Sequence, residues 1–203
     1  EQSGKDVGAI IVPSGDLTLA NCKVERTSLN APSYGLLVNV GAHTLTATDT
    51  VFIAPHHPET VGSTAPSTLE AMAGLYLTNC EIRTNGYGLF SGHVANGYVK
   101  DTLFTGVTYE GEYLPIGCVF NNTAFSGMTF DGCLFEMGYD STLIGGECTV
   151  INCVFDFSKS TTATNALSFY FQDSDAGSVL IKDNTFIYTA DHQRGINFTW
   201  GRS

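Results

Sequence analysis

The chain has 203 residues, of which 43% are hydrophobic and only 14% are charged, and its formal net charge is −11. The chain has 20 Asp and Glu residues and only 9 Lys and Arg residues, so it should repel phosphate backbones and anionic lipid surfaces. We therefore expect no nucleic-acid partner. No apolar run reaches the length of a transmembrane helix, which predicts no membrane insertion. A single domain over residues 1–203 accounts for this length.

An eight-residue pattern occurs seven times along the chain. Its template is apolar-x-apolar-x-Asn/Asp-Cys/Thr-x-apolar, and its copies cover residues 17–24, 45–52, 75–82, 97–104, 128–135, 148–155 and 179–186. The alternation of apolar and mostly polar residues is typical of β-strands. Asn or Asp at the fifth position predicts a bend, because both residues tolerate left-handed backbone. In the fifth copy Gly132 takes this place.

A second strand is expected upstream of each pattern. In chain order the candidate segments are residues 8–12, 35–38, 88–90, 117–120, 142–144, 167–171 and 196–200. Successive patterns lie 20 to 31 residues apart, a period that indicates stacked solenoid coils. No stretch has the periodicity of a helix, which argues against a leucine-rich repeat. We therefore predict an all-β parallel β-helix of about seven to eight coils.

The bend residues carry a resemblance to a known fold family. They look like the stacked asparagine ladder of the right-handed parallel β-helix superfamily, and they are Asn21, Asp49, Asn79, Asp101, Asn152 and Asp183. That superfamily includes pectate lyases, polygalacturonases and bacteriophage tailspikes, and this chain is most similar to a tailspike or tail-fibre β-helix domain. The resemblance implies a fold and leaves the activity open, because this fold serves lyases, hydrolases, epimerases and binding proteins.

The catalytic motifs of the related enzymes are incomplete in this chain. His93 follows Gly92 as in the Gly-His-Gly segment of polygalacturonases, but Val94 stands where the second Gly is needed. The calcium-binding acid cluster and aligned basic residue of pectate lyases are missing as well. His56 and His57 have no further metal ligands nearby in the sequence, so we predict no metal site and no cofactor.

The six cysteines predict the compartment in which the chain folds. Four of them share one inward position of the repeat with two threonines; this set is Cys22, Thr50, Cys80, Thr102, Cys133 and Cys153. At such a position a cysteine acts as a small buried apolar residue, and free buried thiols suit folding in a reducing cytosol. A disulfide between Cys133 and Cys153 on neighbouring coils stays open as an alternative.

Glu136 and Asp156 are the candidate catalytic residues. Each follows an inward Phe of the repeat, so both should point outward on adjacent coils, with their backbones about 5 Å apart. Carboxylates at this spacing suit a retaining glycosidase, and their like charges would raise the pKa of one of them. The alternative is a pair of solvated surface acids.

Three tyrosines and one arginine are candidates for binding a substrate. Tyr98, Tyr139 and Tyr170 are expected outside the core, where aromatic rings can stack on sugars. Arg83 stands on a predicted coil strand. The alternative for the tyrosines is that they cover neighbouring loops or an oligomer interface. The segments 55–68 and 158–165 are candidate binding loops.

These observations predict a β-helix module of a phage tailspike or tail fibre that binds host cell-surface polysaccharide. Depolymerisation of that glycan by a glycosidase mechanism is left open. Both chain ends look cut from a longer protein, and apolar outward residues such as Leu134 and Ile187 suggest a homotrimer. The expected location is a virion tail or the extracellular space. The alternative is an extracellular bacterial carbohydrate-active enzyme or adhesin domain of the same fold.

Overall fold

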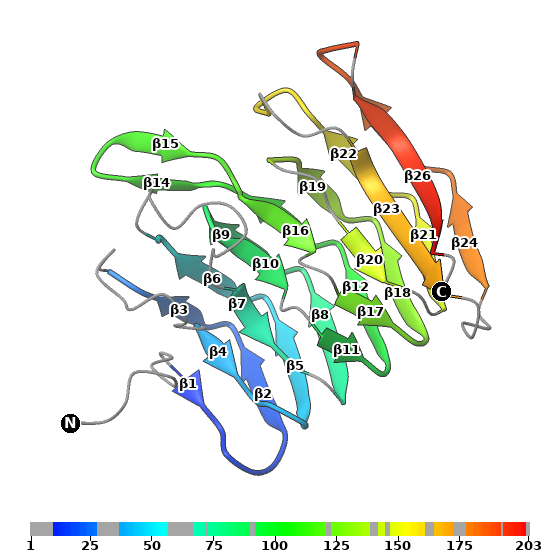
Figure 1. Cartoon of the computed structure of the whole chain (residues 1–203). Helices are drawn as coiled ribbons and strands as arrows, with labels where there is room; N and C mark the ends of the chain where they lie inside the picture. The colour runs from blue at the N-terminus through cyan, green and yellow to red at the C-terminus, as the bar shows by residue number, and fades with distance from the viewer. Residues whose placement is uncertain are drawn as a thin grey trace.

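The strands of this chain stack into a parallel β-solenoid of about five turns (Figure 1). The structure is a computed structural model that describes residues 10–27, 37–56, 67–71, 73–89, 92–120, 123–138, 142–144, 147–160, 165–172, 178–191 and 193–201. These residues form β-strands and turns and no helix. The predicted all-β class and the parallel stacking of coils are confirmed.

Two seven-stranded parallel sheets carry the repeated pattern, one on each side of the bend. Sheet I consists of β2 (Leu17–Ala20), β5 (Thr44–Thr48), β8 (Gly74–Thr78), β12 (Gly97–Lys100), β18 (Met128–Asp131), β21 (Cys148–Ile151) and β24 (Val179–Lys182). Sheet II consists of β3 (Lys23–Glu25), β6 (Val51–Ala54), β9 (Glu81–Thr84), β13 (Leu103–Thr105), β19 (Leu134–Glu136), β22 (Val154–Asp156) and β25 (Thr185–Ile187). Equivalent positions of successive copies pair in register throughout both sheets.

The strands upstream of the pattern belong to two sheets. Sheet III consists of β1 (Ile10–Ile11), β4 (Val38–Asn39), β7 (Ser67–Glu70), β10 (Tyr87–Leu89) and β16 (Cys118–Phe120). Sheet IV consists of β11 (Gly92–Val94), β17 (Thr123–Phe125), β20 (Thr142–Ile144), β23 (Asn165–Gln172) and β26 (Arg194–Gly201). One upstream strand was expected for each copy of the pattern, so β11 and β17, which follow closely on β10 and β16, were missed, and so was β7.

The predicted bend between sheets I and II is confirmed at every copy of the pattern. The φ angle lies between 48° and 56° at Asn21, Asp49, Asn79, Asp101, Asn152 and Asp183, and it is 67° at Gly132. Asn and Asp alternate along the first four coils, so no carboxylate of this column lies beside another there. Asn79 instead donates its Nδ2 hydrogen to Asp49 Oδ1 at 2.5 Å.

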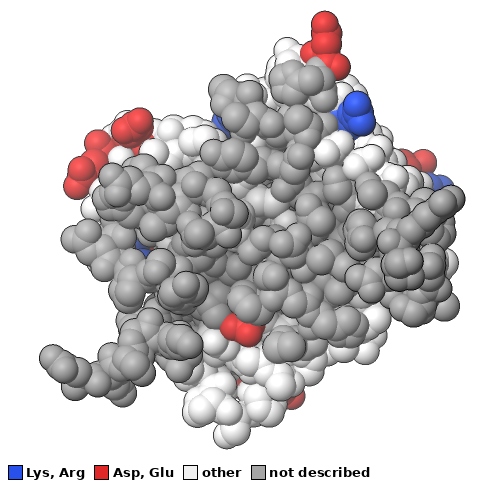
Figure 2. Space-filling view, viewed as in Figure 1, with Lys and Arg blue, Asp and Glu red and all other residues white. Residues whose placement is uncertain are grey.

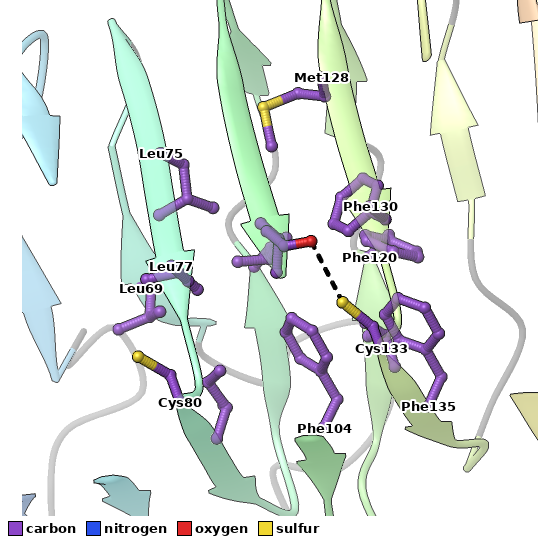
Figure 3. Close-up of a cluster of buried hydrophobic side chains, with 14 of the residues drawn as sticks. Leu69, Leu75, Leu77, Cys80, Phe104, Phe120, Met128, Phe130, Cys133 and Phe135 are labelled. Carbon is purple, nitrogen blue, oxygen red and sulfur yellow. Dashed lines mark hydrogen bonds between the residues drawn. The ribbon is translucent and has the colours of Figure 1, made fainter. Parts of the chain in front are cut away.

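The position after the bend is an inward column in which Cys and Thr make the same contact. Thr50 Oγ1 donates to the carbonyl of Thr48 at 2.9 Å, and Cys80 Sγ donates to the carbonyl of Thr78 at 3.3 Å. In Figure 3 the Cys133 side chain points into the core, and its Sγ donates to the carbonyl of Val99 at 3.3 Å. All six cysteines are free thiols. Contact with the Cys153 sulfur and burial together raise the pKa of Cys133.

The core is a continuous column of apolar side chains between the sheets (Figure 3). Two residues after the Cys/Thr position, stacked rings follow one another on successive coils from Phe104 to Phe186. Their centroids are 5.1 Å apart for Phe104 and Phe135, 4.7 Å for Phe135 and Phe155, and 5.1 Å for Phe155 and Phe186. This stack fixes the rotation of each coil, and with it the direction of the outward residues that follow.

Candidate functional site

The outer face of sheet II carries the charged residues singled out in the sequence. The residue after each inward apolar position points outward and forms one column along the solenoid: Glu25, Ile53, Arg83, Thr105, Glu136, Asp156 and Ile187. Arg83 and the two candidate catalytic acids therefore lie on one face, with Thr105 between Arg83 and Glu136.

Glu136 and Asp156 are direct neighbours in this column. They pair in register between β19 and β22. Gly132 keeps the left-handed bend of the other coils, so its presence in place of Asn or Asp does not disturb the pairing. Asp156 Oδ1 also accepts a hydrogen bond from the Ser158 amide at 2.8 Å, which starts the turn after β22. The predicted adjacency is thus present, while a catalytic role for the pair stays a prediction.

The surroundings of Glu136 differ from those of a general acid. Its side chain is only 16% exposed, and Oε1 accepts a hydrogen bond from Lys159 Nζ at 2.8 Å. Oε2 accepts hydrogen bonds from Tyr113 OH at 2.9 Å and from Thr105 Oγ1. Burial alone would raise the pKa of Glu136, but the three hydrogen bonds outweigh it and the pKa is lowered. The sequence predicted a raised pKa for one of the two acids, and Glu136 is not that acid, because its neighbours stabilise the charged form.

A hairpin that sequence analysis missed supplies one of these neighbours. Strands β14 (Val107–Tyr109) and β15 (Glu112–Leu114) pair in antiparallel fashion and project from the solenoid after β13 (Figure 1). The turn residues Glu110 and Gly111 both have positive φ, 48° and 85°, as in a type I′ turn. Acidic side chains gather at the hairpin tip, at the upper left of Figure 2. The sequence signal for this hairpin is the pair Glu110-Gly111, which stands between two short segments of alternating residues.

Tyr113 fastens the hairpin to the solenoid. Its hydroxyl donates to Glu136 and accepts a hydrogen bond from the Gly106 amide at 3.3 Å, while Lys159 Nζ lies 4.7 Å from the centre of its ring. Gly106 is required at this crossing, since a Cβ there would lie 2.3 Å from the carbonyl oxygen of Leu114. Glu136 therefore serves as an anchor for the hairpin.

A groove of about 370 Å³ lies between this hairpin and the first coils of sheet II. Its walls include the side chains of Lys23, Glu25, Glu81, Arg83, Thr105 and Tyr113. Arg83 pairs with Glu81 on its own strand at 2.7 Å, and this hydrogen bond raises the pKa of Arg83. Because a guanidinium has five N–H donors, most of those on Arg83 stay available to a molecule in the groove.

Tyr98 is the one candidate tyrosine whose side chain the structure describes, and it lies away from this groove. Tyr98 lies on the outer face of sheet I, where its hydroxyl donates to Asp131 Oδ2 at 2.8 Å. The hydrogen bonds from Asn152 and Tyr98 lower the pKa of Asp131. Tyr139 lies outside the described residues, and Tyr170 is described only as a backbone position of β23. Tyr113 is the groove tyrosine, and it was not among the candidates.

In the part of the chain that the structure describes, no three His, Cys, Asp or Glu side chains come close enough together to hold a metal ion, and no helix is long and apolar enough to cross a membrane. No family model, curated protein or solved structure matches this sequence.

Proposed function

We propose that this chain is a glycan-binding β-helix module of a phage tailspike or tail fibre, with bacterial surface polysaccharide as its ligand. The observation that carries the proposal is the groove between the β14–β15 hairpin and sheet II. It combines an arginine with free donors, a tyrosine held in place and carboxylates on a rigid face. Convergent polar groups beside an aromatic ring are the chemistry by which proteins hold sugars.

The finer description of the fold belongs to the same proposal. We infer right-handed winding and seven to eight coils, as in the pectate-lyase-like superfamily that the bend residues resemble. The seven strands in each of sheets I and II support the coil number. Outward apolar residues at the far end of sheet II, among them Leu134 and Ile187, support burial between subunits of a homotrimer.

Binding is tested with a panel of bacterial capsular and O-antigen polysaccharides. Retention of the protein should weaken at least tenfold in Arg83→Ala. It should be unchanged in Arg194→Ala, which removes an exposed arginine from β26 on another sheet. Light scattering should give three copies of the 21.7 kDa chain. No retention by any polysaccharide, or equal retention by both variants, would remove the groove from consideration.

Cleavage of the glycan is the second candidate, favoured by the register of Glu136 and Asp156. A Glu136 with a lowered pKa suits the nucleophile of a retaining glycosidase, which leaves Asp156 as the acid. Release of reducing ends that stops in Asp156→Asn would support this reading. Binding without release would leave the chain as an adhesive module. A monomer active on glycans other than bacterial surface ones would favour the extracellular bacterial enzyme or adhesin.

A further inference from the structure

A pair of exposed tyrosines on sheet I lies apart from the groove. Tyr76 on β8 and Tyr98 on β12 are partners in the parallel register, with exposed fractions of 42% and 36%. Neither ring stacks on another aromatic ring among the described residues. Both tyrosines occupy outward positions of the repeat, so their rings stand on the solenoid without filling its core.

The two rings are held in different directions. Tyr76 leans toward the start of its strand, over Gly74, where an added Cβ would lie 3.1 Å from Tyr76 Cε2. Tyr98 leans toward the end of its strand, because its hydroxyl bonds Asp131, the register partner of Lys100. The absence of a side chain at Gly74 leaves room for the Tyr76 ring, and the carboxylate of Asp131 holds the Tyr98 ring by a hydrogen bond. Both rings are therefore oriented before a ligand arrives, which lowers the entropy cost of binding.

Polar groups surround the rings on the same face. Thr46 precedes Tyr76 in the outward column and Thr129 follows Tyr98, each one coil away. Lys100 and Asp131 lie in the next outward column. Hydroxyl, ammonium and carboxylate groups beside two ring faces can form hydrogen bonds to a sugar whose C–H face stacks on the rings.

These features favour a glycan over a protein partner. Strands β8 and β12 each have hydrogen-bonded neighbours on both sides, so a peptide cannot add to them as a further strand. The apolar patch consists of two rings with hydrophilic neighbours. It is smaller than the interface of a stable dimer, which buries about 800 Å² per partner. Successive coils are about 4.8 Å apart. Because the two rings lean in opposite directions along their strands, their centres lie farther apart than this spacing, and a sugar chain that touches both rings crosses the coils obliquely.

We propose that Tyr76 and Tyr98 form a second carbohydrate-binding platform, which stacks neutral sugars of one chain that crosses the two coils obliquely. The proposal rests on the proposed function for the class of ligand, and its place on sheet I is independent of the groove. A platform beside a charged groove would let one polysaccharide contact two faces of the solenoid, with the gain in affinity expected of two linked sites.

The test follows the tyrosine ring signals by NMR during titration with cellotetraose, a neutral, extended β-1,4-linked tetramer. The ring signals of Tyr76 and Tyr98 should shift, and the dissociation constant should rise at least fivefold in Tyr76→Ala and in Tyr98→Ala. Tyr98→Phe keeps the ring and loses only the contact with Asp131, so its dissociation constant should rise less than that of Tyr98→Ala. Arg83→Ala should bind cellotetraose as the parent chain does.

Three results would overturn the platform. The first is an absence of shifts at Tyr76 and Tyr98 at millimolar cellotetraose. The second is an unchanged affinity for cellotetraose in the variant that carries both Tyr76→Ala and Tyr98→Ala. The third is a double variant that alters the oligomeric state and leaves cellotetraose binding intact, which would assign the surface to a second copy of the chain. If Arg83→Ala loses polysaccharide retention and cellotetraose shifts no signal of Tyr76 or Tyr98, the groove is a glycan site and the platform is not.

Discussion

His56 should make the stability of the solenoid depend on pH. Its side chain is 2% exposed at the end of β6, and its Nδ1 accepts a hydrogen bond from Arg26 Nη1 at 3.2 Å. Its backbone is held by Asn85, which bonds both its N–H and its C=O, at 2.7 and 2.9 Å. Burial and the nearby Arg26 charge lower the pKa of His56 from 6.5 to about 3.

A lowered histidine pKa stabilises the folded state only while the ring is neutral. The contribution is complete above the unfolded value of 6.5 and is lost as the pH falls toward 3, because the unfolded chain then binds a proton that the folded chain does not. Each pH unit in this window corresponds to about 1.4 kcal/mol. Between pH 7.5 and 4.5 the free energy of unfolding should therefore fall by about 2 to 3 kcal/mol through this one residue.

The assay is urea unfolding of the parent chain and of His56→Asn between pH 7.5 and 4.5. The amide oxygen of Asn can take the place of Nδ1 as acceptor for Arg26 without titrating, so the variant should lose about 2 to 3 kcal/mol less than the parent. His43→Asn controls for removal of an imidazole at a partly exposed site. Parallel stability curves for the parent and His56→Asn would refute the reasoning.

Three further predictions test the bend, the ring stack and the thiols. Gly132→Ala should lower the free energy of unfolding by more than about 1 kcal/mol, since φ is 67° there and the new Cβ would lie 2.5 Å from Asp101 Oδ1; equal urea midpoints would contradict this. Phe155→Ala, which opens the ring stack, should cost about 3 to 5 kcal/mol, measured the same way, and a loss below 1 kcal/mol would speak against a packed stack. A thiol reagent should modify the half-buried Cys22 before the other five cysteines, which should react together only on unfolding; rapid reaction of all six would show a loose core.

The fold was predictable because each coil repeats the same local choices. Alternation placed Phe135 and Phe155 inward, and the left-handed preference of residues such as Asn79 placed the bend. Outward directions followed from these two facts, so Glu136 and Asp156 were correctly placed as neighbours. The strands outside the pattern share no such template, and β7, β11 and β17 were missed for this reason.

The groove was less predictable, because its contacts join residues far apart in sequence. Tyr113 and Glu136 are 23 residues apart, and nothing in either segment indicates that a hairpin would fold back to join them. Lys159 was placed within a candidate binding loop, yet it contacts Glu136 and the ring of Tyr113. The pKa of Glu136 follows these contacts, so Glu136 is not the acid of the pair whose pKa was expected to rise.

The alternation of Asn and Asp at the bend also restricts which coils a length variant of this solenoid can lose. If the third coil alone were deleted, Asp49 would come to lie beside Asp101, and two carboxylates would stand one coil apart with no amide between them. Deletion of two successive coils would keep an amide next to each acid. Among the first four coils, the third is therefore the one that cannot be lost alone without pairing two carboxylates, whereas loss of the second would set Asn21 beside Asn79.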